Sequence, residues 1–342
     1  MAASQDKALN EALREPVWPA PPPAFTWFGF ALFALLAAYP FIFTGTFSHH
    51  LMIMVFLHAL MAQSWNVVAG MSGQISLGHA VFFGLGAYAS AVLYVKWGIT
   101  PWIGLIVGMA ISALVAAAIG IPTLRLRGHY FAIATLLIGI SFQIIFQRWD
   151  WIGAASGIWM PIVRDDPWLS LQFHGSKLPY YYMSFGLCIA AFAVVWFLQR
   201  QRLGMRLLAV RDEPEAAASL GIDVAWHKVI AFMISGAMMS TAGTFFAQYV
   251  LVIDPDRVFN FEISVLALLM VVLGGIGTLW GPALGAAILV PLSEYSRTWF
   301  GGTGGTIDLI VYGILILLIC IYQPRGLLSL VTERLRQRTH AT

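Results

Sequence analysis

The stretch Pro101–Ile121 reads PWIGLIVGMAISALVAAAIGI and contains no charged side chain. A helix needs about 20 apolar residues to cross the roughly 30 Å hydrocarbon core of a bilayer. The run shows no alternation of apolar and polar residues, so a helix fits it better than a barrel strand. The stretch therefore predicts a transmembrane helix.

The whole chain of 342 residues has a similar character, since 59% of its residues are hydrophobic and only 10% are charged. Soluble domains carry about 25% charged residues. So few charges cannot cover a soluble surface, which excludes a cytosolic enzyme, a nucleic-acid-binding protein and a disordered chain. The composition predicts an all-α, polytopic integral membrane protein. Cys188 and Cys320 lie in separate apolar runs, and their spacing indicates neither a disulfide nor a metal site.

Other apolar runs are long enough, or nearly long enough, to cross a bilayer. With the first stretch they are Phe25–Phe47, Leu51–Gly70, Gln74–Val95, Pro101–Ile121, Tyr130–Phe146, Leu178–Leu198, Val229–Val250, Glu262–Gly275, Pro282–Tyr295 and Ile307–Tyr322. The sequence thus predicts about ten transmembrane or partly re-entrant helices. The two short runs at 262–295 either extend through the glycine-rich joint between them or form a re-entrant pair.

The basic residues set the expected orientation, because cytoplasmic loops are enriched in Lys and Arg. With the N-terminus inside, most of the 19 basic residues fall on the cytoplasmic side. Both termini are therefore predicted to be cytoplasmic. The expected organisation is a cytoplasmic N-terminal arm at 1–24, a transmembrane domain at 25–323 and a cytoplasmic basic tail at 324–342. Within the domain, 148–177 forms an external loop and 203–223 a cytoplasmic loop.

The carboxylates indicate where the energy for transport comes from. None of the 16 carboxylates falls at mid-depth in a predicted span, whereas carboxylates inside the membrane usually mark proton or cation relays. This disfavours an ion-coupled secondary transporter, although backbone carbonyls can also bind sodium. No lysine stands in a Gly-Lys-Ser or Gly-Lys-Thr context, so ATP and Mg would bind to separate ATPase subunits. We expect no cofactor, no metal site and no enzymatic activity on this chain.

The segment Asn66–Ala91, NVVAGMSGQISLGHAVFFGLGAYASA, combines small residues with a polar group near the cytoplasmic side. Two interpretations stay open. The polar residues either satisfy the backbone of a helix-turn-helix joint or line a wall or gate of a translocation pathway; the pathway candidates are Asn66, Gln74, Ser76 and His79. A second cluster of small residues favours close helix packing or a hinge; it contains Gly274, Gly275, Gly277 and Gly281.

The cytoplasmic stretch Leu203–Asp223 reads LGMRLLAVRDEPEAAASLGID. Pro214 can begin a short helix, the alanines after it favour helix, and Gly221 can end it. The stretch is either an interfacial loop with one helical turn or a coupling helix that docks in a groove of an ATPase.

Five stretches together carry a family resemblance: Asn66–Ala91, LRLRGHYFAIATL at Leu124–Leu136, EAAASLGI at Glu215–Ile222, GGIGTLWGPALGA at Gly274–Ala286 and QPRGLL at Gln323–Leu328. With these stretches the chain resembles the LivM-type permease subunits of branched-chain amino acid ABC transporters.

The resemblance implies a half-permease in the bacterial inner membrane that passes a small, branched-chain amino acid. It implies a related LivH-type permease subunit, two cytoplasmic ATPase subunits and a periplasmic substrate-binding protein as partners. Similar permeases serve urea, short amides or aromatic acids, so these solutes are alternatives. By match, the residues expected in coupling to the ATPase are Arg211, Glu215, Ala216, Ala217 and Gly221.

Overall fold

The computed structural model describes residues 23–126, 128–163, 166–300 and 327–328. The chain divides after Ser48 into two units. The first contains helix α2, Pro23–Ile42. The predicted span Ile307–Tyr322 lies outside the described residues, as do nearly all residues of the predicted N-terminal arm and basic tail.

Seven helices in the described part of the chain are long and apolar enough to cross a membrane. They are α3 (Thr46–Asn66) continued by the π-helix η1 (Val67–Met71), α4 (Ala80–Trp97), α5 (Pro101–Thr123), α6 (His129–Arg148), α8 (Leu178–Arg200), α11 (Val224–Val250), and α12 (Pro255–Val258) with α13 (Phe261–Gly274). Helix α14 (Gly281–Phe300) follows. The helical, polytopic fold predicted from composition is confirmed.

The bounds of helix α5 follow closely from the local sequence. The Thr100 hydroxyl accepts a hydrogen bond from the backbone N–H of Trp102, and Pro101 occupies the first turn. Both are favourable at a helix start, where backbone N–H groups lack partners. The predicted run Pro101–Ile121 therefore agrees with the observed helix to within two residues.

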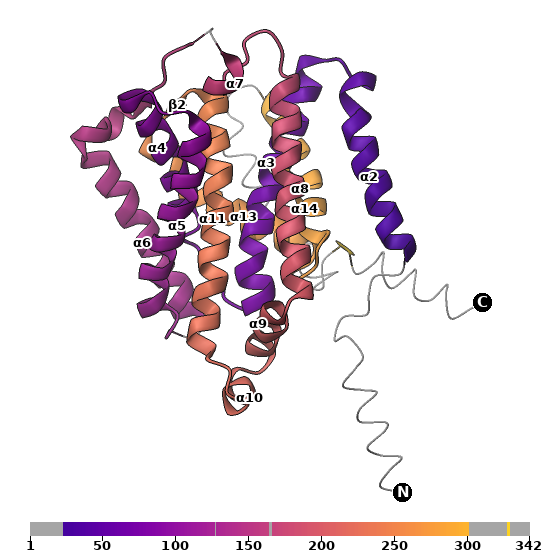
Figure 1. Ribbon diagram of the computed structural model, residues 1–342, viewed down its shortest axis with the longest axis vertical. Helices are drawn as coiled ribbons and strands as arrows, with labels where there is room; N and C mark the ends of the chain where they lie inside the picture. The colour runs from indigo at the N-terminus through magenta and orange to yellow at the C-terminus, as the bar shows by residue number, and fades with distance from the viewer. Residues whose placement is uncertain (1–22, 127, 164–165, 301–326, 329–342) are drawn as a thin grey trace, which may run out of the picture. The chain divides into compact units, whose positions relative to one another are not determined.

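Helices α4, α5 and α11 pack closely in the centre of the bundle (Figure 1). A Cβ atom at Gly86 of α4 would fall on the carbonyl of Ser240 in α11, and one at Gly108 of α5 would lie 3.0 Å from the Ser240 hydroxyl. Small residues thus let the helix backbones come into contact, as is usual where lipid provides no hydrophobic drive for association.

The prediction of a span at Gln74–Val95 is wrong at its start. Helix α4 begins at Ala80, and residues 73–79 form a mostly buried, non-helical segment. Gly73 turns the chain with φ +72°. The segment gains partners from neighbouring helices: Trp65 Nε1 donates to the Ser76 carbonyl at 2.8 Å, and the Leu77 N–H donates to Thr135 Oγ1 at 3.0 Å. Such partners let an irregular backbone lie inside a membrane protein.

The two short runs at 262–295 form two separate helices, α13 and α14, which pack against each other. A turn at residues 275–280 joins them. Gly275 and Gly277 adopt positive φ values of 128° and 78° in this turn. The helix does not continue through the glycine-rich joint.

The segment 148–177 is folded at one end of the bundle. Its short elements are η2 (Asp150–Ile152), η3 (Ala154–Ser156), β1 (Ile158–Trp159) and α7 (Pro167–Ser170). Strand β1 pairs antiparallel with β2 (Val252–Ile253), which follows α11. The buried Gln172 side chain closes the loop, since it donates to the Pro161 carbonyl and accepts from the Val163 N–H, both at 3.0 Å.

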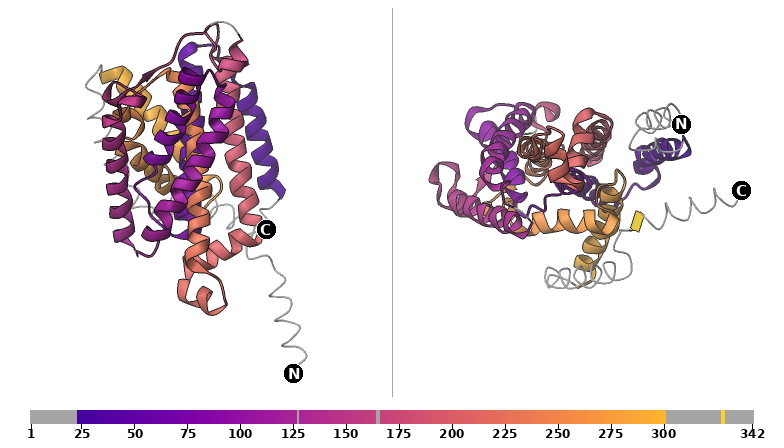
Figure 2. Two further views of the ribbon diagram at one scale, coloured as in Figure 1. Left: turned by 60° about the vertical axis from the view of Figure 1, so that its left-hand side comes forward. Right: turned by 90° about the horizontal axis from the view of Figure 1, so that it is seen from below.

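At the opposite end, α8 is followed by α9 (Arg202–Asp212) and α10 (Pro214–Ser219). Figure 2 shows these two short helices projecting beyond the ends of the long helices. The loop predicted at 203–223 is therefore a folded helical element, which we call the α9–α10 element.

Candidate functional site

Helix α10 has well-defined ends. Pro214 lies in its first turn. At its other end the Ile222 N–H donates to the Ala217 carbonyl, and the Gly221 N–H donates to the Ala218 carbonyl. This is the Schellman arrangement, which places a left-handed residue after the helix. Gly221 occupies that position with φ +83°. The short helix predicted from Pro214 and Gly221 is present.

One side of α10 is anchored and the rest is open. Ala217 is 2% exposed, whereas Leu220 is 81% exposed. Glu215, Ala216 and Gly221 also lie on the exposed side. The exposed side of α10 thus combines an apolar residue, Leu220, with the carboxylate of Glu215.

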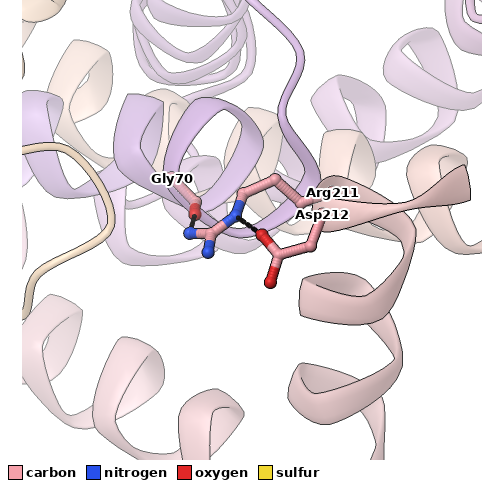
Figure 3. A network of polar contacts seen from close by, with 3 residues as sticks. All are labelled: Gly70, Arg211 and Asp212. Carbon is pink, nitrogen blue, oxygen red and sulfur yellow. Dashed lines mark hydrogen bonds and ion pairs between the residues drawn. The ribbon is translucent and has the colours of Figure 1, made fainter.

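Arg211, the last basic residue of α9, points toward the backbone of Gly70 (Figure 3). Its Nη1 donates a hydrogen bond of 2.7 Å to the carbonyl of Gly70 in η1. Its Nε donates to Asp212 Oδ1 at 2.8 Å. The partly exposed Arg211 side chain therefore reaches from α9 to the end of the helix at 46–71.

Two glycines, Gly73 and Gly277, make room for this arginine, and a third, Gly70, lets Gly277 come close. A Cβ atom at Gly73 would lie 2.9 Å from Arg211 Cγ, and one at Gly277 would lie 3.1 Å from Arg211 Nη1. A Cβ atom at Gly70 would lie 2.7 Å from the backbone N of Gly277. We call Gly70, Gly73 and Gly277, together with the Arg211 side chain between them, the glycine junction.

Asn66 binds the two sides of the glycine junction together. Its Oδ1 accepts from the Gly277 N–H at 2.8 Å, and its Nδ2 donates to the Thr278 carbonyl at 3.0 Å. The side chain is fully buried. The two segments rich in small residues, which lie about 200 positions apart in the sequence, are therefore in direct contact.

The turn between α13 and α14 is tight. A Cβ atom at Gly274 would fall on the carbonyl of Gly281, and one at Gly281 would lie on the Thr278 hydroxyl. The Thr278 hydroxyl donates to the Gly275 carbonyl at 2.8 Å and accepts from the Gly281 N–H at 3.1 Å. These contacts explain why the turn needs glycine at several positions.

The other pathway candidates are also buried in this chain. His79 Nε2 lies 2.8 Å from Ser235 Oγ, and this hydroxyl donates to the Ser64 carbonyl at 2.6 Å. Ser76 is fully buried, and Gln74 is 8% exposed. The contacts of Asn66, Ser76 and His79 are those of a packed joint between helices. That these residues line a route for solute stays a prediction.

Sequence reasoning missed several polar residues that hold the joint. Gln63 Nε2 donates to the Leu279 carbonyl at 2.5 Å, and the Ser264 hydroxyl accepts from the Ala80 N–H at 2.9 Å. Gln63 and Ser64 precede Asn66 in an otherwise apolar run, which is a usable signal. No group of three or more His, Cys, Asp or Glu side chains that could hold a metal occurs among the described residues.

The described geometry can be compared with known proteins. The family described as branched-chain amino acid transport system, permease component, matches residues 48–320. The high-affinity branched-chain amino acid transport system permease protein LivM of Escherichia coli (strain K12) is 30% identical over 333 residues, which cover 91% of this chain and 76% of that protein.

Two further relatives are more distant. The permease protein LivH of the same E. coli transport system is 25% identical over 286 residues, or 80% of this chain and 91% of that protein. The nucleoside ABC transporter permease protein NupC of Lactococcus lactis subsp. cremoris is 26% identical over 199 residues, or 54% of this chain and 61% of that protein.

Proposed function

Because the chain belongs to the family of permease components of branched-chain amino acid transport systems, we propose that it is one half of an amino acid import channel. The family places it as a multi-pass, non-catalytic membrane subunit of a bacterial ABC transporter. In our proposal it pairs with a LivH-type permease, two cytoplasmic ATPases and a periplasmic substrate-binding protein. ATP and Mg bind to the ATPases.

The single observation that carries this proposal within the family is the α9–α10 element. It projects from one end of the bundle, its helix α10 begins at Pro214 and is capped at its C-terminus, and Leu220 is exposed. We propose that this end is cytoplasmic and that Glu215, Ala216 and Gly221 contact an ATPase. Ala217, which is buried, holds α10 on the permease.

The opposite end then faces the periplasm. The folded segment 148–177 and strand β2 lie there together, and we propose that they receive the loaded binding protein. Exposed aromatic side chains cluster in this segment, among them Trp149, Trp159 and Trp168. Tryptophan is enriched both at membrane interfaces and in protein contacts.

The proposed solute is a branched-chain amino acid. The similarity to LivM over most of both chains supports it. NupC, a nucleoside permease by name, is similar over only about half of this chain, so the proposal rests on the longer similarity to LivM. We infer that affinity lies mainly in the binding protein, since a pathway that binds solute weakly releases it readily.

Uptake into proteoliposomes tests the proposal. The chain is reconstituted with its co-encoded permease, ATPases and binding protein, and radiolabelled leucine is supplied outside with ATP inside. Leucine accumulation should require both ATP and the binding protein. Calorimetry on the binding protein with leucine, urea and a nucleoside identifies the solute independently.

Two results would contradict the proposal. Uptake that continues without ATPase subunits under a sodium or proton gradient would identify an ion-coupled secondary transporter. Assembly of the complex without flux of any solute held by the binding protein would indicate a non-transporting scaffold. Glu215→Lys should reduce uptake, whereas Ser141→Ala on α6, far from α10 in the chain, should not.

A further inference from the structure

We propose that Arg211 is a positioning residue that links movement of the α9–α10 element to two non-helical joints of the permease, the segment 73–79 before α4 and the turn 275–280 between α13 and α14. This inference rests on the proposed function, because it assigns the path by which an ATPase acts on the membrane domain. It differs from a contact with the ATPase, since the Arg211 guanidinium points into the chain.

The first step is the bond between Arg211 and Gly70. Gly70 lies in the last turn of the long helix formed by α3 and η1. Carbonyls in a last turn lack intrahelical partners and carry the negative end of the helix dipole. A guanidinium is the strongest available partner for such a carbonyl. Displacement of Arg211 therefore acts directly on the end of this helix.

The second step leads from Gly70 to the turn between α13 and α14. Gly277 is next to both Gly70 and the guanidinium. Gln199, at the end of α8, lies 3.5 Å from the Gly277 carbonyl. Asn66 bonds Gly277 and Thr278, so the end of α3 and this turn move as one.

The third step leads from Gly73 to the start of α4. The Arg211 side chain passes over Gly73, the first residue of the irregular segment 73–79. This segment bonds to α6 through Thr135, and α4 begins directly after it. The Arg211 side chain thus lies beside two non-helical joints between helices. Helices change direction at such breaks at the least cost in free energy.

Helix α9 is built to transmit such a movement. Leu207 and Val210 are fully buried, while Arg206 on the same helix is exposed. Asp212 receives Arg211 Nε but is 65% exposed, so this ion pair is screened and mainly orients the guanidinium. The asymmetric burial makes Arg206 a matched control for the loss of an arginine on α9.

The test compares ATP hydrolysed with leucine transported in the full complex. Arg211→Met keeps the apolar stem and removes the guanidinium. We expect hydrolysis to persist while uptake per ATP falls about tenfold, the size of a typical coupling between sites. Arg211→Lys should restore part of the ratio, because lysine keeps the charge without the two-sided geometry. Arg206→Met should behave like the unmodified chain.

A distance measurement tests the same link without relying on uptake. Spin labels are placed at Ser219→Cys on α10 and Ile75→Cys in the irregular segment, both exposed positions, after replacement of the two native cysteines. ATP binding should leave this distance unchanged in the unmodified chain and change it in Arg211→Met.

The outcomes separate the two proposals. If the unmodified complex imports leucine and Arg211→Met lowers uptake and hydrolysis in the same proportion, Arg211 is only structural and the proposed function stands. An ATP-induced distance change that is the same with and without the guanidinium also overturns the link. If the unmodified complex shows no ATP-dependent uptake, the proposed function itself fails.

Discussion

The central packing of α4, α5 and α11 and the glycine junction both depend on glycine, but they use it in opposite ways. In the centre, glycine brings continuous helices into backbone contact along their sides. At the junction, glycine clears space for a charged side chain where helices are interrupted. The first arrangement gives a rigid body, since many weak contacts must break together. The second concentrates its strength in a few polar bonds.

The largest effect is expected from a variant that disrupts the close packing of α4, α5 and α11. A Cβ atom at Gly243 of α11 would fall on the Phe83 carbonyl of α4. Gly243→Leu should therefore destabilise the protein by roughly 3 kcal/mol, measured by thermal unfolding of the purified chain in detergent. Gly186→Leu on α8 is the control, because nothing lies within 4 Å of that position. Equal stability of the two variants would refute close packing of α4 and α11.

The next effect concerns the glycine junction. Asn66→Leu leaves the Gly277 N–H and the Thr278 carbonyl without this partner, and an unpaired buried polar group costs about 1–3 kcal/mol. We expect a lower unfolding temperature and faster hydrogen exchange at residues 275–280. Ser141→Ala removes only a bond of 2.8 Å within α6 and should leave both unchanged. Unaltered exchange in Asn66→Leu would show that the turn does not depend on Asn66.

A third variant tests whether side-chain bonds to the backbone also stabilise the irregular segment 148–177. Gln172→Leu removes two bonds that close the segment 148–177. The expected cost is about 1–2 kcal/mol, confined to this loop. Limited proteolysis should cut the loop faster, with uptake per ATP unchanged. His174→Ala, at an exposed position nearby, is the control, and a changed transport ratio in Gln172→Leu would show that this region also takes part in coupling.

The smallest effect is expected at Gly221. Its φ of +83° places it in the left-handed region, while nothing lies within 4 Å of an added Cβ. Gly221→Ala should therefore strain the backbone by about 1 kcal/mol, a cost that we expect to be confined to local opening of α10. The loss should appear as weaker stimulation of ATPase activity by the loaded binding protein, with the unfolding temperature unaffected. Gly186→Ala, in a helix, should be neutral or slightly stabilising. A lower unfolding temperature in Gly221→Ala would show that α10 supports the bundle.

The long helices were predictable because length and apolar composition alone determine them. The run at Pro101–Ile121 predicted α5 nearly to its ends. The start of α4 was not predicted, because residues 74–79 mix polar and apolar side chains and this mixture does not distinguish a helix from an irregular backbone. What interrupts the helix is a set of partners from other helices, such as Thr135, and no local pattern reports them.

The short helix α10 was predictable from the sequence, whereas the contacts between distant segments at the glycine junction were not. Pro214 and Gly221 predicted α10 from neighbouring residues. The contact of Arg211 with Gly70 joins residues that are 141 positions apart in the sequence. In the sequence Arg211 simply belongs to the same predicted loop as the exposed residues of α10, so its direction could not be read from its position. Its inward direction follows from the burial of Leu207 and Val210 on α9. That Asn66 and Gly277 belong to one junction also required the fold.

The acceptor of the Arg211 bond is a backbone carbonyl, which every amino acid carries. A substitution at position 70 therefore cannot delete the acceptor, and a larger residue there would collide with the Asn66 side chain and with Gly277. In a genetic screen, the bond can be lost by replacing Arg211 or by a larger residue that displaces it, but never by removing its acceptor. Variants that regain transport after the loss of Arg211 should then map to the residues that shape its space, at positions 73 and 277, and not to its partner.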